Sequence, residues 1–134
     1  MEVQVNFLAV ILATVASYVI ASLWYGLIFA KPWKKLTGIK DMKPLPLNIL
    51  LVLVGSFIMS FVLYHSIAFG NAFLKTGGIS GGMMGGFWDW LGYIAPVTLC
   101  TKLYENKPWK LWLLDNGFWL IALLVMGGII GGMM

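Results

Sequence analysis

Charged side chains are scarce in this sequence, and their scarcity argues against a soluble fold. They make up 10% of the 134 residues, whereas soluble domains carry about 25%. The sequence has one cysteine and one histidine, so we expect no intramolecular disulfide and no metal cluster built on these residues. It also contains no phosphate-binding loop and suggests no Ser–His–Asp arrangement. We therefore expect neither an enzyme nor a bound cofactor.

Long apolar runs take the place of the missing charge. Four runs carry no charged residue or a single acid, namely residues 5–30, 44–74, 76–101 and 111–134. A helix needs about 20 mainly apolar residues to cross the hydrocarbon core of a bilayer. The sequence therefore predicts one all-α domain over residues 1–134, a bundle of four transmembrane helices. We place the spans at about 6–29, 46–74, 80–104 and 108–134.

Lysine supplies all nine basic residues of a chain with net charge +4. Eight of the nine lie at the first and third connections between predicted helices, and only Lys75 lies at the second. Basic residues favour the cytoplasmic side of a membrane. We therefore expect an integral protein of the cell inner or plasma membrane, with loops 31–46 and 104–110 in the cytoplasm and both termini outside. Because the lysines border apolar helices, we expect membrane lipid rather than nucleic acid as their partner.

A Lys-Pro-Trp-Lys motif occurs twice, at residues 31–34 and 107–110. Each copy follows a predicted helix on the same side of the membrane. A duplication would give two parallel two-helix repeats. Alternatively, lysine and tryptophan are both favoured at the membrane interface, and this preference would produce the repeated motif without a duplication. The predicted interface anchors are Trp24, Trp33, Lys34, Trp109 and Lys110.

Glycine is abundant, with 16 residues, and much of it recurs at a spacing of four. In lipid, small residues at positions i and i+4 let two helices approach closely. The glycine-rich start of the third predicted helix and the glycine-rich end of the fourth would lie at one membrane level. We expect close packing within one chain or across a homo-oligomer, and backbone carbonyls lining a polar path or simple loop flexibility are the alternatives. The predicted packing residues are Gly78, Gly82, Gly86, Gly128, Gly132, Ala13 and Ser17.

Two ionisable residues interrupt the second and third predicted spans. His65 and Asp89 each lie about ten residues from the connection between these spans, which places both on the order of 12–15 Å below the outer surface. An ionisable group inside a membrane is by default a functional hypothesis. As partners, the two side chains would form the start of a proton relay or a cation site. The alternatives are a structural hydrogen bond between helices, or an interfacial position shared with Trp88 and Trp90.

Polar residues on the predicted cytoplasmic side form a second candidate group. Glu105 and Asp115 flank the second Lys-Pro-Trp-Lys copy. We expect them to form ion pairs with nearby lysines, which are Lys102, Lys107 and Lys110. Alternatively, the side chains of Asp115 and Asn116 form hydrogen bonds in the interior of the bundle.

Four short motifs occur in an order that resembles the domain of unknown function 1761 family. They are Leu-Trp-Tyr-Gly at 23–26, Gly-Tyr-Ile-Ala-Pro at 92–96, Leu-Tyr-Glu-Asn-Lys-Pro-Trp at 103–109 and Asn-Gly-Phe-Trp at 116–119. The resemblance would cover nearly the whole chain. It implies a small four-helix integral membrane protein and no particular activity. Phe118 departs from the pattern, because members of the family tend to have tyrosine there.

Two functions remain open from the sequence. The first is a homo-oligomeric channel or transporter-like subunit with a polar site at His65 and Asp89. The second is a structural or accessory protein that binds lipid or a larger membrane complex without transporting anything. Polar side chains along a wet path would favour the first, and polar side chains sealed between helices would favour the second.

Overall fold

A computed structural model describes residues 2–41 and 43–134. Every regular element in these ranges is helical, as the sequence predicts. Three of the helical segments, Phe7–Ile28, Pro46–Leu74 and Trp109–Met133, are long and apolar enough to span a membrane. The elements in chain order are α1 (Phe7–Leu23), the π-helical turn η1 (Trp24–Ile28), α2 (Ala30–Thr37), α3 (Pro46–Leu74), α4 (Gly78–Asp89), the π-helical turn η2 (Trp90–Ile94), α5 (Ala95–Tyr104) and α6 (Trp109–Met133).

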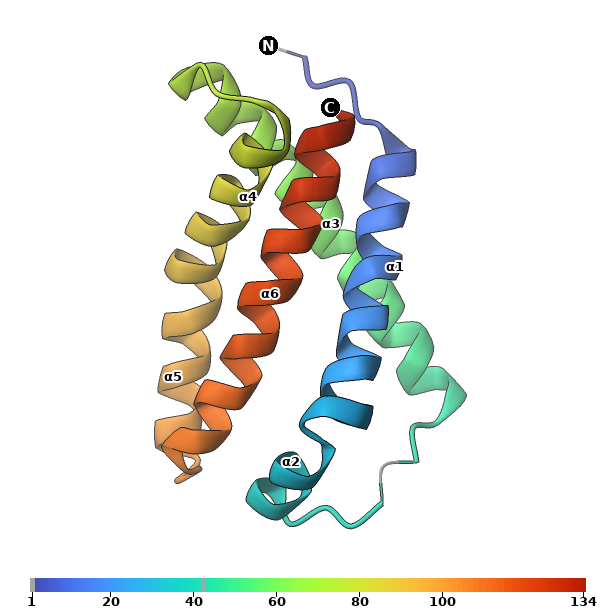
Figure 1. Ribbon diagram of the computed structural model, residues 1–134, viewed down its shortest axis with the longest axis vertical. Coiled ribbons are helices and arrows are strands. Elements are labelled where there is room, and N and C mark those ends of the chain that lie inside the picture. The colour runs from blue at the N-terminus through green and yellow to red at the C-terminus, as the bar shows by residue number, and fades with distance from the viewer. Residues whose placement is uncertain (1, 42) are drawn as a thin grey trace.

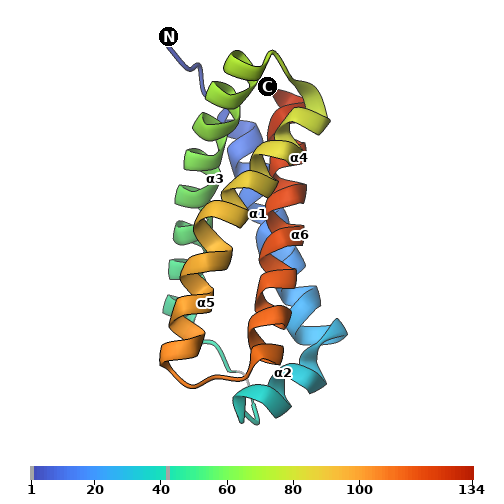
Figure 2. The ribbon, with the colours of Figure 1, turned by 90° about the vertical axis from the view of Figure 1, so that its left-hand side faces the viewer.

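The long helices run side by side along one axis, with α3 crossing obliquely behind α6 and α1 (Figure 1). Both termini and the α3–α4 turn lie at one end, which we call the termini end. The short helix α2 and the α5–α6 turn lie at the other (Figure 2). Eight of the nine lysines lie in residues 31–43 and 102–110, the segments at and next to this second end. We call it the lysine-rich end.

Local sequence signals account for where the helices begin and end. The side chain of Asn6 caps α1 by accepting hydrogen bonds from the amides of Leu8 and Ala9. Pro46 opens α3, where its missing N–H costs nothing. Gly38 and Lys75 end α2 and α3 in the left-handed region, with φ of 74° and 55°. Such a residue after the last turn is a common helix stop.

The segment 31–46 differs from the expected loop because its first part is helical. Phe29, with φ −116° and ψ 21°, separates η1 from α2. The chain thus leaves its first long helix before Pro32, and Pro32 lies in the first turn of α2, where proline is tolerated. This short helix places Trp33 and Lys34 beside the end of the bundle.

Two π-helical turns interrupt helices that the sequence predicts as regular. Phe29 donates its amide to the carbonyl of Trp24, and Ala95 donates to Trp90, in each case across five residues. A proline follows each turn closely, at positions 32 and 96. Pro96 lacks an amide donor and its ring crowds the carbonyl of Gly92, which lies in η2, so the irregular turn lies where proline disturbs a regular helix. Pro32 follows the break at Phe29 and lies in the first turn of α2. Helix continues through η2, so residues 78–104 form one unbroken helical run.

Glycine backbones form the contact between α4 and α6. A Cβ atom added to Gly82 would collide with the carbonyl oxygen of Gly127 and lie 2.9 Å from Cα of Gly131. A Cβ on Gly86 would collide with the carbonyl oxygen of Leu123. No side chain larger than hydrogen fits at these positions unless the helices separate.

The other expected packing residues lie on neighbouring contacts. Gly128 and Gly132 face side chains of α4, because a Cβ on either would lie 3.4 Å from Met83 and 3.0 Å from Ile79, respectively. The closest approach on α6 therefore uses the adjacent pair, Gly127 and Gly131. Gly78 contributes its carbonyl oxygen to the contact with Gly131.

The core lies where α1, α3 and α6 meet. Val10, Ile67, Met126 and Ile130 are fully buried there. Ala13 and Ser17, two of the expected packing residues, are buried on α1 as well. Thr14 on α1 donates a hydrogen bond of 3.1 Å to Ser60 on α3, so two hydroxyl groups link these helices inside the core.

Only part of α3 takes part in this packing. Its buried residues are Ser56, Ser60, Leu63, Tyr64 and Ile67. The first ten residues of α3, from Pro46 to Gly55, include none that is buried. At the lysine-rich end α3 therefore lies apart from the other helices.

The glycine contact gives a stability prediction. Gly82→Ala places a methyl group against the backbone of α6, and overpacking of this kind costs about 1–3 kcal/mol. We expect a lower free energy of unfolding in detergent, measured by thermal melting or denaturant titration. Gly55→Ala is the matched control, since nothing lies within 4 Å of its added Cβ. There we expect a gain of up to about 1 kcal/mol from helix propensity. Equal effects at both glycines would contradict the prediction.

Candidate functional site

Asp89 is held between α3 and α4. It is the last residue of α4, and its carboxylate accepts a hydrogen bond of 3.0 Å from the hydroxyl of Ser66 on α3. Both side chains are half-buried. In the described residues, the single ion pair lies elsewhere, between Lys102 and Asp115. The Asp89 carboxylate thus has a hydroxyl partner and no basic partner in the described part of the chain.

His65 lies beside this pair without bonding to it. Its Nδ1 atom lies 2.8 Å from the carbonyl oxygen of Phe61. A carbonyl oxygen only accepts, so Nδ1 is the donor and carries the hydrogen. The ring packs at 4.6 Å from Phe61 and 6.5 Å from Phe69, measured between centroids. Ser66 therefore makes the contact with Asp89 that the sequence suggested for His65.

Two hollows open on the Asp89–Ser66 pair. The larger, of about 560 Å³, has a mainly apolar lining that also includes His65, Phe69 and Tyr93. The smaller, of about 120 Å³, runs along α3 and α4 toward their turn and includes Asn71 and Thr76 in its lining. Asp89 and Ser66 line both. The carboxylate therefore lies on the wall shared by a narrow hollow toward the termini end and a wider apolar groove.

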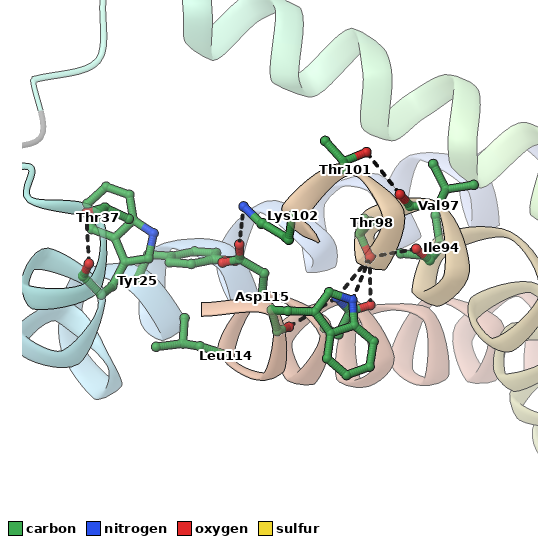
Figure 3. Close-up of polar contacts among 12 residues, drawn as sticks. Tyr25, Thr37, Ile94, Val97, Thr98, Thr101, Lys102, Leu114 and Asp115 are labelled. Atoms are coloured by element: carbon green, nitrogen blue, oxygen red, sulfur yellow. Dashed lines mark hydrogen bonds and ion pairs between the residues drawn. The ribbon is translucent and has the colours of Figure 1, made fainter. Parts of the chain in front are cut away.

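A second polar cluster lies at the lysine-rich end and is centred on Asp115 of α6 (Figure 3). Lys102 of α5 approaches one carboxylate oxygen to 3.1 Å, and the hydroxyl of Tyr25 donates to the other at 2.8 Å. The two oxygens are thus held by a cation and a neutral donor from different helices. Lys102 is one of the three lysines expected near Asp115.

A model of the family described as "Protein of unknown function (DUF1761)" matches residues 8–131. The chain belongs to this family. The resemblance that the four short motifs suggested is thereby confirmed. No curated protein and no solved structure matches the chain.

Two of the motifs that carried the resemblance to the DUF1761 family meet in the structure. Trp24, in the Leu-Trp-Tyr-Gly motif, donates its indole N–H to the carbonyl of Leu114 at 3.1 Å. Its ring lies over Gly117, where an added Cβ would be 3.1 Å from the ring. Tyr25, the next residue, contacts Asp115, which follows Leu114 in α6. The first and last motifs of this DUF1761 protein therefore build one helix contact.

Asn116 forms the buried polar centre beside the Asp115 cluster. It is 2% exposed. Its amide nitrogen donates to Oγ1 of Thr98 at 2.9 Å and to the carbonyl of Trp112 at 3.1 Å. Thr98 also accepts from the indole nitrogen of Trp112 at 3.2 Å. This network seals α5 against α6.

The remaining expected anchors have different surroundings. Trp33 packs edge-on against Tyr25 at 5.9 Å, and Lys34 is exposed on α2. Trp109 is 57% exposed at the start of α6, and Lys110 follows it on the exposed surface. Glu105 caps the end of α5 and is exposed. Its side chain forms no ion pair within the described ranges.

Two further hollows adjoin the Asp115 cluster. One of about 410 Å³ lies between α1 and the unpacked part of α3, and Tyr25, Trp33, Asn48, Asp115 and Trp119 contribute to its lining. A polar one of about 270 Å³ is lined by Tyr25, Gly26, Ala30, Lys34, Asp41 and Lys43. Tyr25 lines both. An apolar groove with aromatic walls thus lies next to a hollow with two lysines.

Tyr25 is the site residue that sequence reasoning missed. In the sequence it stands out only as part of the Leu-Trp-Tyr-Gly motif at 23–26. Its role depends on the π-helical turn η1 and on a residue 90 positions away. In the described residues, no group of three His, Cys, Asp or Glu side chains is placed to hold a metal ion.

Paired threonine variants test the α5–α6 network. Thr98 and Thr101 both bond a carbonyl four residues earlier in α5, but only Thr98 also bonds Asn116 and Trp112. Thr98→Val leaves these buried groups short of a partner, at a cost of about 1–3 kcal/mol. Thr101→Val on the exposed face should change the free energy of unfolding far less. Thermal melts of both variants in the same detergent measure this difference. If Thr101→Val lowers the melting temperature as much as Thr98→Val does, the network does not stabilise the contact between α5 and α6.

Proposed function

We propose that this protein is a four-span integral membrane protein whose third span is the helical run over residues 78–104. The run is unbroken and, at 1.5 Å per residue, extends about 40 Å, which exceeds the hydrocarbon core of a bilayer. It packs along α6 through glycine, and its two ends lie level with those of α6 (Figure 2). The lysine-rich end then faces the cytoplasm, and both termini lie outside.

Within that frame, we propose a transporter-like subunit with its site at Asp89. The observation that carries the proposal is the position of this carboxylate on the shared wall of two hollows. The narrow hollow is lined by Ser66, Asn71 and Thr76 and leads to the outer turn. The wide hollow is open along the side of the bundle. An ionisable group inside a membrane costs free energy, and more so without a basic partner. Such a residue is therefore a candidate functional group.

A homo-oligomer would complete such a site. One 134-residue chain has little room for an aqueous path of its own. The wide hollow opens on the side of the bundle, so a second copy is positioned to cover it. Ala16 of α1 and Gly128 and Gly132 of α6 line a further open groove, which offers a surface for such a contact. No catalytic step is part of this proposal.

Substitution of Asp89 tests the proposed transporter-like function. Asp89→Asn keeps an acceptor for the Ser66 hydroxyl but removes the charge and the exchangeable carboxyl proton. In reconstituted vesicles with an internal pH-sensitive dye, we expect ion-gradient-driven proton flux with the native chain and loss of most of that flux in the variant. Glu105→Gln removes an exposed carboxylate outside every hollow described above and should leave the flux unchanged. Equal flux from Asp89→Asn and the native protein would reject the proposal.

A second candidate function is supported at the lysine-rich end. An accessory protein that binds anionic lipid would place a headgroup by Lys34 and Lys43 and an acyl chain in the adjoining groove between α1 and α3. The aromatic and apolar lining of the groove would contact the acyl chain, and the two lysines next to it would contact the headgroup. Together they complement an amphiphilic molecule. Such a protein would serve a larger membrane complex or the lipid itself, without transport.

Lysine variants test this second candidate. Replacing Lys34 and Lys43 together by glutamine removes both cations from the polar hollow. We expect native mass spectrometry of protein purified with phosphatidylglycerol to detect several-fold less bound lipid. Replacing Lys107 and Lys110 by glutamine removes the same charge from the same end, outside the hollow, and should leave lipid retention near the native level. Equal losses from the two double variants would indicate general charge attraction and would count against a defined lipid site.

A further inference from the structure

We propose that the wide hollow at Asp89 binds a lipophilic organic cation. This inference rests on the transporter-like function above and names its substrate class. It starts from charge. The Asp89 carboxylate contributes a negative charge to a groove whose other lining residues supply no lysine and no second carboxylate. A positively charged ligand would therefore neutralise the Asp89 carboxylate, which no lining residue does.

The shape and lining of the hollow exclude most other cations. A volume of about 560 Å³ falls within the roughly 300–1,000 Å³ of small-molecule sites. A bare metal ion requires several oxygen or nitrogen ligands. Here one carboxylate, two hydroxyls and one imidazole share the lining, and the imidazole already donates to Phe61. A cation that carries its own hydrocarbon shell needs no such ligand set.

Aromatic rings provide the second contact that such a cation needs. Phe69 and Tyr93 line the hollow and are 52% and 72% exposed, so their faces are available. A cation near an aromatic face gains about 0.5–2 kcal/mol, and more of that range as water is excluded. The carboxylate lies on α4, with Phe69 on α3 and Tyr93 on η2. The ligand would therefore bind between two helices.

The groove also fits the route by which a lipophilic cation would arrive. It opens along the side of the bundle, where the surrounding residues are apolar, such as Met59 and Val62. A molecule dissolved in the membrane would enter sideways and reach Asp89 without crossing the dry core. The narrow hollow lined by Asn71 and Thr76 then connects the same carboxylate to the termini end.

Binding of tetraphenylphosphonium tests the inference directly. The native protein is placed in nanodiscs of zwitterionic lipid and titrated with radiolabelled tetraphenylphosphonium. We expect saturable binding, at least tenfold weaker in Asp89→Asn and several-fold weaker in Tyr93→Ala. Glu2→Gln removes an exposed carboxylate from the same end of the molecule and should bind as the native chain does. Thermal melts of each variant show whether it is folded, and Tyr93→Phe, which keeps the ring, should restore binding.

A second ligand separates charge recognition from simple partition into an apolar groove. Tetraphenylborate has the same shape and the opposite charge, so the native protein should not bind it in a manner that depends on Asp89. Equal binding of the two ions would overturn the inference and assign the groove to uncharged hydrocarbon. Proton flux that depends on Asp89, in a protein that binds no phosphonium, would overturn this inference and leave the proposed function standing. Absence of both would reject both.

Discussion

The backbone contact between α4 and α6 is the constraint on which the rest of the structure depends. Gly82 and Gly86 on one helix and Gly127 and Gly131 on the other leave no room for a side chain. In lipid there is no hydrophobic force between helices, so close van der Waals contact has to supply the attraction. At the other end the Thr98–Asn116 network holds α5 to the same helix. The run from α4 to α5 and the helix α6 thus form one pair fastened at both ends, and α1 and α3 pack on that pair.

Fixing this pair also fixes where polar groups lie. Asp89 lies three residues after Gly86, so its side chain leaves α4 beside the glycine contact, on the side where α3 packs and Ser66 binds it. The π-helical turn η2 follows at once, and after it Thr98 faces α6. One helical run therefore presents its acid to one neighbour and its hydroxyl to another. The sealed contacts and the open groove are consequences of the same arrangement.

The helical segments follow from the sequence because charge is absent from long runs. Absence of charge is a local property, and the expected second helix has the bounds of α3. The π-helical turns were not predictable in this way, since prolines at 32 and 96 allow a kink, a stop or a widened turn, and neighbouring helices decide among these. Likewise Tyr25 and Asp115 are 90 residues apart, and nothing in either local pattern points to the other. The choice of Gly127 and Gly131 over Gly128 and Gly132 depends on the rotation of a whole helix, which a spacing of four leaves undetermined.

The uneven packing of α3 has a mechanical consequence. Its second half is buried against α1, α4 and α6, whereas residues 46–55 include none that is buried. Segments with few buried contacts open at the lowest free energy. The unpacked first ten residues of α3 can therefore bend or fray at low cost, whereas the packed half, which carries Ser66, stays in place beside Asp89.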